Sequence, residues 1–186
     1  SLDGLPPHQR IRAGLGRTFQ GIELYDDLSV AENVLVGETA SRFGRHHPLR
    51  STAESSELDD VYELLGLAEV RDRPVGELSQ GYRQLVSIAR ALAGRPRVVL
   101  LDEPAGGLDA TESEWLGERV HDVRRAGVSV LLVDHDMSLV LGVCDLIYVL
   151  DVGRMIACGT PDQIKDDSAV AAAYLGTTHA REPEIT

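Results

Sequence analysis

The sequence predicts an α/β fold, in which helices cover a parallel sheet and the first half of the chain is largely helical. Two continuously apolar runs, residues 98–101 and 128–133, flank a helical pattern over residues 111–126, which predicts a strand-helix-strand unit. Apolar strands without polar alternation are typical of parallel sheets that are covered on both faces. The change from helices to strands falls near residues 94–96.

Two helices of the first half are predicted from capping and apolar spacing. Ser29 and Glu32 form a capping-box pattern, which opens a helix running toward Gly37. A stripe of apolar residues within 58–65 predicts a second helix, and Gly66 closes it.

A third helix is predicted after Ser79, with Gly94 placed as the glycine that ends it. Its apolar face has helical spacing and is formed by Leu85, Ile88, Ala89 and Leu92. Nearer the carboxyl end, the two segments that flank residues 151–153 predict a hairpin. Short helices follow from Thr160 and from Ser168, and Gly176 is predicted to close the second one.

The composition disfavours several classes of function. The chain has 186 residues, a formal net charge of −12 and a pI near 4.8, which disfavours binding to nucleic acid or to anionic lipid surfaces. Its longest apolar runs fall far short of the ~20 residues that span a bilayer, so we expect membrane contact to go through another protein. Cys144 and Cys158 form no C-x-x-C pair, which favours reduced thiols in the cytosol.

Two adjacent carboxylates, Asp102 and Glu103, come directly after the apolar run 98–101. Open α/β sheets place their ligands at the carboxyl ends of the strands. Mg²⁺ takes oxygen ligands beside substrate phosphates, and a second carboxylate can orient or deprotonate an attacking water. Asp102 therefore suits the metal and Glu103 suits the water. Taken alone, the pair is equally well explained as acidic residues that end a strand in solvent.

His135 follows the next apolar strand, and in a parallel sheet it emerges at the same edge as the two carboxylates. It is placed there to contact a phosphate. Taken alone, a histidine between two aspartates is more often a solvated strand end.

Three further positions are candidates for ligand contact. Ser79 can cap the helix that follows it, and Gly81 lets free amides approach an anion at that helix start, although an ordinary N-cap explains the same pattern. Gln20 ends an extended stretch and carries an amide that can sense a metal or a water. Asp109 is equally well a turn residue before the next helix.

Taken in order, the segments that contain these candidate residues resemble a known family, although no single segment would show this. RTFQ ending at Gln20, LSQGYRQ from Leu78, VVLLDEPAGGLD from Val98 and LLVDHD from Leu131 resemble the motifs of ATP-binding-cassette (ABC) ATPases. They correspond in order to the Q-loop, the signature, the metal-and-base strand with its D-loop, and the histidine switch. The resemblance covers nearly the whole chain. It implies a partial P-loop NTPase-type sheet core with an inserted helical subdomain.

Both ends of the chain are similar to the ATPase subunits of branched-chain amino acid importers, in segments that begin at Gly14 and Cys144. Polar amino acid, amide or urea importers and the lipopolysaccharide-export ATPase share much of this pattern. The resemblance implies ATP hydrolysis coupled to transport at the cytoplasmic face of the membrane, with ATP and Mg²⁺ as cofactors. The implied partners are transmembrane permease subunits, a second ATPase subunit in a head-to-tail dimer and, indirectly, a solute-binding protein.

The resemblance also implies a role for each candidate residue. Asp102 and Gln20 would help to hold Mg²⁺, and Gln20 would couple the site to the transmembrane partner. Glu103 would polarise the attacking water and His135 would touch the γ-phosphate. The residues that would contact the nucleotide of the other subunit, or communicate with it, are Ser79, Gln80, Gly81 and Asp109.

The sequence departs from the family pattern at two places. The commoner signature LSGGQ is LSQGY here, so Gln80 and Tyr82 replace a glycine and a glutamine. The printed sequence also has no G-x-x-x-x-G-K-[ST] motif, and its single lysine is Lys165. The gap falls before Ser1 and favours truncation over degeneration. Because each missing hydrogen bond to phosphate is worth about 1.5–3 kcal/mol, we expect this chain alone to bind nucleotide poorly and to have negligible activity.

The resemblance divides the chain into four segments. Residues 1–20 would end the amino-terminal core with the Q-loop, residues 21–94 would form the helical subdomain, residues 95–158 would supply core strands and helices, and residues 159–186 would form the carboxyl-terminal helices and tail. Since neighbouring strands would be missing, we expect an exposed sheet edge and apolar surface, with self-association or marginal stability as the result.

Two other classes of function remain open. A non-catalytic interaction module would keep the cassette fold to bind a permease or a regulator. A chromosome-maintenance or DNA-repair ATPase would carry long coiled-coil insertions, whereas residues 20–79 hold only short helices and the charge is acidic. The transported substrate is not readable, since specificity belongs to the permease and the binding protein.

Overall fold

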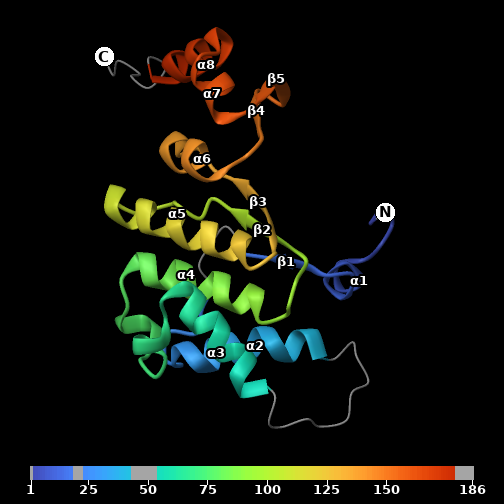
Figure 1. Ribbon diagram of the computed structural model, residues 1–186, viewed down its shortest axis with the longest axis vertical. Coiled ribbons are helices and arrows are strands. Elements are labelled where there is room, and N and C mark those ends of the chain that lie inside the picture. The colour runs from blue at the N-terminus through green and yellow to red at the C-terminus, as the bar shows by residue number, and fades with distance from the viewer. Residues whose placement is uncertain (1, 19–22, 43–53, 179–186) are drawn as a thin grey trace, which may run out of the picture. The chain divides into compact units, whose positions relative to one another are not determined.

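The computed structural model describes residues 2–18, 23–42 and 54–178. The chain separates into two compact units, Ser1–His135 and Asp136–Thr186 (Figure 1). A parallel sheet with its helices forms the first unit, and an antiparallel hairpin with short helices forms the second.

Three parallel strands form the sheet of the first unit, in the order β1-β2-β3. The strands are β1 (Leu15–Arg17), β2 (Val98–Asp102) and β3 (Ser129–Val133). Val99 of the middle strand pairs with Gly16 on one side and with Val130 on the other. The predicted strand-helix-strand unit is confirmed, with α5 (Ala110–Arg125) as the crossover from β2 to β3.

The first half of the chain supplies most helices of this unit. They are α1 (Pro7–Arg12), α2 (Val30–Arg42), α3 (Glu54–Leu65), the 3-10 helices η1 (Ala68–Val70) and η2 (Val75–Glu77), and α4 (Gln80–Leu92). The capping box of α2 is present: the N–H of Ser29 donates to the Glu32 carboxylate at 2.8 Å, and the N–H of Glu32 donates to the Ser29 hydroxyl at 3.2 Å. The sequence did not lead us to expect α1.

Gly37 does not end α2, which continues to Arg42. A Cβ at Gly37 would collide with the carbonyl oxygen of Arg90 in α4. The glycine is therefore required by the close approach of α2 and α4 and not by a helix end.

The end of α4 lies where it was predicted. The helix stops at Leu92 with Ala93 as its C-cap, so Gly94 directly follows the helix, and the residue with a left-handed backbone is Arg95, with φ of 52°. Pro96 follows directly, and its ring and missing N–H prevent the helix from continuing.

The core of the first unit lies between α4, α5 and one face of the sheet. Val99 and Leu101 of β2 are at most 2% exposed on this face. The apolar face predicted for α4 is confirmed, because its members are at most 5% exposed. The helical side chains buried here include Leu65, Leu85, Ile88, Ala89, Leu92, Leu116, Val120 and Val123.

The other face of the sheet is open in the part of the first unit that the structure describes. Leu131 and Val133 of β3 are each 56% exposed, and Leu100, which pairs with Leu131, lies on the same face. We call these three residues the bare sheet face. Within the first unit, α4 and α5 both pack on the Val99 side of the sheet, and helices on both faces remain a prediction. Exposed apolar surface had been expected from a core without neighbouring strands.

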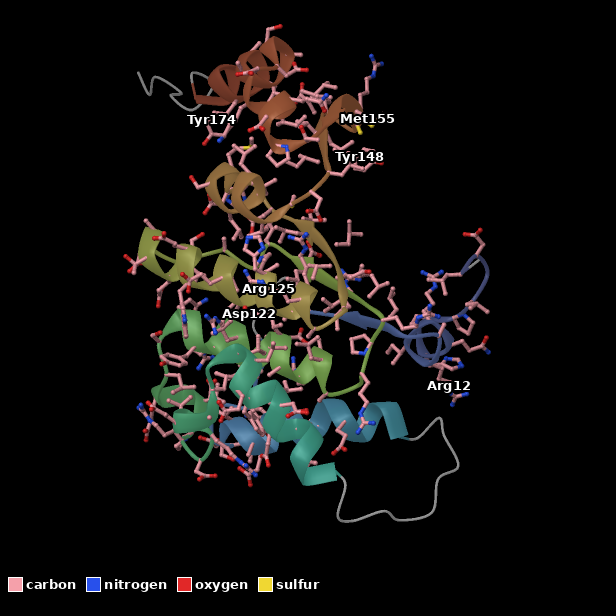
Figure 2. The ribbon with its side chains drawn as sticks, viewed as in Figure 1. Arg12, Asp122, Arg125, Tyr148, Met155 and Tyr174 are labelled. Carbon is pink, nitrogen blue, oxygen red and sulfur yellow. The ribbon has the colours of Figure 1, made fainter. Side chains whose placement is uncertain are left out.

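The second unit consists of α6 (Met137–Val143), β4 (Ile147–Asp151), β5 (Arg154–Gly159), α7 (Pro161–Lys165) and α8 (Ser168–Thr178). The predicted hairpin is confirmed: β4 and β5 are antiparallel, and the turn uses positive φ at Val152 and Gly153. Tyr148 and Met155, labelled in Figure 2, are 60% and 61% exposed on this hairpin. Throughout the described ranges, each helix is too short or too polar to span a bilayer.

Candidate functional site

Two neighbouring strands end together and place four polar residues at one edge of the sheet. Asp102 pairs in register with Val133, so Asp102 and Glu103 leave β2 where Asp134 and His135 leave β3. The N–H of Glu103 donates to the carbonyl oxygen of Val133 at 2.7 Å, which extends the ladder by one residue. We call Asp102, Glu103, Asp134 and His135 the strand-end cluster.

Glu103 has a left-handed backbone, with φ of 48°. Hydrogen bonds hold this conformation on both sides, since its N–H bonds to Val133 and its carbonyl oxygen accepts the N–H of Gly106 at 3.1 Å. A strained conformation that the surrounding structure fixes is a common property of functional residues. The strain was not visible in the sequence, where Glu103 is simply the second of two acids.

Asp134 is a member of the strand-end cluster that the sequence reasoning missed. Its side chain is fully buried, and its two carboxylate oxygens accept the N–H of Ala105 at 2.9 Å and the N–H of His135 at 2.7 Å. The carboxylate therefore joins the turn after Glu103 to the residue after β3. Its only signal in the sequence was an acid before the histidine, which reads as a solvated strand end.

The ring of His135 projects into solvent. Its side chain is 81% exposed, and Nδ1 lies 3.8 Å from Asp134 Oδ1, which is beyond hydrogen-bond distance. The imidazole is therefore accessible to a ligand at the edge of the sheet.

Asp102 forms an ion pair with Arg17 of β1, which the sequence reasoning also missed. Arg17 Nη2 lies 3.1 Å from Asp102 Oδ2, with the two side chains 56% and 32% exposed. An exposed pair of this kind contributes only about 0–1 kcal/mol, so an arriving cation can compete for the carboxylate.

The described residues supply only part of a metal site. Among them, no group of three or more His, Cys, Asp or Glu side chains lies close enough to hold a metal ion. Mg²⁺ nevertheless binds through one or two carboxylates together with phosphate oxygens and water, and Asp102 fits that ligand set. Gln20, the other candidate ligand, lies outside the described residues.

The remaining candidates gather at the starts of two helices. The Ser79 hydroxyl accepts the N–H of Tyr82 at 3.5 Å and caps α4, and Asp109 accepts the N–H of Glu112 at 2.8 Å and caps α5. Ser79, Gln80 and Asp109 are exposed. We call Ser79, Gln80, Gly81 and Asp109 the helix-start cluster.

Glu112 links the two helix starts and was also missed. Its Oε1 accepts the N–H of Gly81 at 3.2 Å, and its Oε2 accepts the N–H of Asp109 at 3.5 Å. The expectation of a free amide at Gly81 was therefore wrong, because a side-chain carboxylate of the same chain occupies it. The D-x-x-E pattern predicts the capping box of α5 but carries no sign of the contact with Gly81, which lies 31 positions away.

The unusual signature residues contact α5 and the loop before it. The ring of Tyr82 packs edge-on against Trp115, with centroids 4.9 Å apart and an angle of 68° between the planes. The amide nitrogen of Gln80 lies 3.8 Å from the position that a Cβ of Gly107 would occupy. The departures from the commoner signature therefore join α4 to the segment that contains Asp109.

Comparison with known families assigns the chain to a family. Residues 2–106, more than half of the chain, match the family described as ABC transporter, and residues 154–180 match the family described as branched-chain amino acid ATP-binding cassette transporter. The high-affinity branched-chain amino acid transport ATP-binding protein LivG of Escherichia coli (strain K12) is 38% identical over 185 residues, which covers 94% of this chain and 72% of LivG.

Two further comparisons agree with this assignment. The lipopolysaccharide export system ATP-binding protein LptB of Acidithiobacillus ferridurans is 37% identical over 176 residues, covering 94% of this chain and 70% of LptB. The ADP conformation of MJ1267, an ATP-binding cassette of an ABC transporter, superposes with a TM-score of 0.78 at 29% identity, over 91% of this chain and 71% of that one. The fold is thus the α/β cassette of P-loop NTPase type. The chain belongs to the ABC transporter ATPases, and over most of its length it is similar to the members that serve branched-chain amino acid transport.

Proposed function

We propose that this chain is an ATP-hydrolysing subunit of an ABC importer for branched-chain amino acids. The strand-end cluster carries the proposal, because Asp102, Glu103 and His135 leave adjacent strands at one edge of the sheet. The similarity of the chain to LivG, and the match of residues 154–180 to a branched-chain amino acid family, support the choice of substrate.

Each residue of the strand-end cluster has a distinct role in this proposal. Glu103 orients and polarises the attacking water, and its fixed left-handed backbone limits the directions in which the carboxylate can point. His135 contacts the γ-phosphate with its exposed imidazole. Asp102, together with Gln20, holds Mg²⁺, whose bound charge would neutralise phosphate oxygens. Asp134 keeps the turn after Glu103 and the backbone of His135 in place.

The helix-start cluster serves a second ATPase subunit in a head-to-tail dimer. Ser79, Gln80 and Asp109 are exposed at the starts of two helices that Glu112 joins, where they can contact a nucleotide held by another subunit. Residues 21–94 form a helical subdomain that couples the site, through Gln20, to transmembrane permease subunits at the cytoplasmic face of the membrane. A solute-binding protein acts indirectly through the permease. The net charge of −12 argues against a nucleic-acid partner.

One other assignment has a specific observation in its favour. LptB covers nearly as much of this chain at nearly the same identity as LivG does, so an export ATPase is the second candidate. Transport assays with leucine, isoleucine and valine separate the two, since only the importer accumulates these amino acids in response to ATP.

The proposal is tested by ATP hydrolysis in the assembled transporter that contains this chain. The assembly is used because, in this proposal, the helix-start cluster of a second ATPase subunit completes each nucleotide site. Glu103→Gln removes the base but keeps the shape, and we expect turnover to fall by about 10²-fold or more. Glu114 of α5 provides the control, because it is exposed and belongs to neither cluster. Hydrolysis at the wild-type rate in Glu103→Gln would refute the proposed catalytic role.

The isolated chain provides a separate test. We expect it to bind ATP weakly and to turn over negligibly, since the phosphate-binding amides and lysine of the missing motif are absent from the printed sequence. Steady hydrolysis by the purified chain that is abolished by Glu103→Gln would show that this expectation is wrong, while supporting the role of Glu103.

A further inference from the structure

The starts of α4 and α5 are joined by contacts that neither helix needs for its own formation. Gly81 donates its N–H to Glu112, and Tyr82 packs against Trp115. The aromatic contact is apolar and lies one turn inside α5, whereas the contact of Glu112 is polar and lies at the helix start. Of these side chains, Glu112 alone also bonds to the backbone of Asp109.

We propose that Glu112 is a positioning residue that makes the signature segment, residues 79–81, and Asp109 move as one unit. The inference rests on the proposed function, in which both segments face the nucleotide of a second subunit. The observation behind it is that one carboxylate accepts hydrogen bonds from two backbone N–H groups, one in the first turn of α4 and one at the N-cap of α5.

The electrostatics of the two helices favour this arrangement. The first-turn amides of a helix carry a partial positive charge, and here one carboxylate lies at two such ends, at Gly81 of α4 and Asp109 of α5. Hydrogen bonds from backbone amides to a carboxylate are also stronger than those between neutral groups. A displacement of Asp109 is therefore transmitted to Gly81 through a single side chain, and contacts of both segments with a nucleotide form or break together.

Competition is the opposite role that the same contact allows. The carboxylate of Glu112 occupies the amide of Gly81, so a phosphate that needs this amide would have to displace it. The two roles predict different effects of removing Glu112. Positioning predicts slower ATP turnover, whereas competition predicts tighter binding of ATP.

The first experiment measures amide hydrogen exchange in the 186-residue chain by NMR. We expect Glu112→Ala to accelerate exchange at Gly81 and Asp109 by roughly fivefold, the effect of losing one net hydrogen bond. Glu112→Gln should restore protection at only one of the two amides, because glutamine has a single acceptor oxygen. The control Glu114→Ala removes the same charge from the same helix and should leave both amides unchanged. Unchanged exchange in Glu112→Ala would overturn the link.

The second experiment measures coupling between the segments in the assembled transporter. ATP turnover is compared for Ser79→Ala, Asp109→Ala and the double variant, with Glu112 intact and with Glu112→Ala. When Glu112 is present, we expect the fold-loss of ATP turnover in the double variant to be smaller than the product of the two single-variant fold-losses. The reason is that one substitution already disturbs both segments. With Glu112→Ala the losses should multiply. If Glu112 had a purely structural role, Glu112→Ala would lower the ATP turnover of every variant. The relation between the single and double losses would then be the same in both backgrounds.

The outcomes separate the inference from the proposed function. The same additivity in both backgrounds, or a lower KM for ATP in Glu112→Ala, overturns the positioning role, the second result in favour of competition. If the assembled transporter hydrolyses no ATP, the proposed function and the role of Glu112 in it are overturned. The amide-exchange data then still decide whether Glu112 links Gly81 to Asp109.

Discussion

Glu103, which we propose orients the attacking water, has an unfavourable backbone conformation. A left-handed conformation costs a residue with a Cβ about 1–2 kcal/mol, and the bonds to Val133 and Gly106 maintain it at φ of 48°. The local fold therefore spends stability to set the direction of one carboxylate.

This strain predicts an unusual order of stabilities. We expect Glu103→Gly to be more stable than Glu103→Ala by about 1 kcal/mol, because glycine adopts positive φ without a steric penalty. At Glu114, inside α5, the order should reverse, since glycine is about 1 kcal/mol worse than alanine within a helix. Urea unfolding of the four variants measures both differences. The same order at both positions would contradict the strain at Glu103.

Asp134 offers a second prediction for single residues. Asp134→Ala leaves the N–H groups of Ala105 and His135 without their acceptor, so we expect the free energy of unfolding to fall by about 1–3 kcal/mol. The exposed Asp60 is the control, because Asp60→Ala removes an acid from the surface of α3. Equal urea midpoints for the two variants would show that the bonds of Asp134 contribute no stability.

The residues missed at this scale have one property in common. Arg17, Asp134 and Glu112 act through partners 85, 29 and 31 positions away. Residue type and local spacing predicted the edge at which Asp102 and His135 lie, because that follows from strand direction alone. They could not predict which distant amide or carboxylate completes each contact, since that depends on packing between elements.

At the scale of elements, the contact between α2 and α4 depends on a missing side chain. Gly37→Ala places a methyl group against the carbonyl of Arg90, and we expect the separation of the helices to cost about 1–3 kcal/mol. Gly142 of α6 is a matched control, because nothing lies within 4 Å of the Cβ that an alanine would add there. Gly142→Ala should be neutral or slightly stabilising. If thermal unfolding gave Gly37→Ala a Tm equal to or higher than that of Gly142→Ala, the close contact between α2 and α4 would be refuted.

The start of α2 carries a pH-dependent contribution. Hydrogen bonds from the N–H of Ser29, and then from its hydroxyl, hold the pKa of the Glu32 carboxyl below its usual 4.5. Because the pKa is lowered by folding, the ionised form stabilises the folded chain above pH 4.5, and this contribution disappears as pH falls through the lower, folded value.

We therefore expect the difference in stability between wild type and Glu32→Gln to shrink as the pH falls below 4.5. Glutamine keeps an acceptor for the capping box but does not titrate. Urea unfolding at a series of pH values gives the difference directly. A difference that is independent of pH would mean that Glu32 does not contribute through its charge.

Elements with periodic apolar faces were predictable, and their ends were less so. The apolar face of α4 and the strand runs of β2 and β3 follow from spacing alone. Helix α2 passes through Gly37, and α8 passes through Gly176 to reach Thr178. A glycine inside a helix and a glycine that ends one have the same local sequence signal, so only packing distinguishes them.

At the scale of the whole chain, the bare sheet face is apolar surface that the first unit does not cover by itself. Leu131 and Val133 expose apolar surface next to the edge of a parallel sheet, and such surfaces promote association. We expect the chain to self-associate, with Leu131→Lys plus Val133→Lys raising the apparent dissociation constant by about tenfold or more.

Sedimentation tests this expectation, and Ile11→Lys is the control. Ile11 is 51% exposed on α1 and is not part of the bare sheet face, so its substitution should leave association unchanged. A wild-type chain that sediments as a stable monomer would exclude the sheet face as an association surface.

The position of β2 between β1 and β3 has a consequence for synthesis of the chain. Leu15 of β1 pairs with Val98 of β2, which is synthesised after α2, α3 and α4. These three helices therefore leave the ribosome before β1 can pair with β2. Contacts distant in sequence form slowly compared with local helical ones. Until then Arg17 has no Asp102 to bind, so the ion pair at the strand-end cluster forms only after β2 has been synthesised.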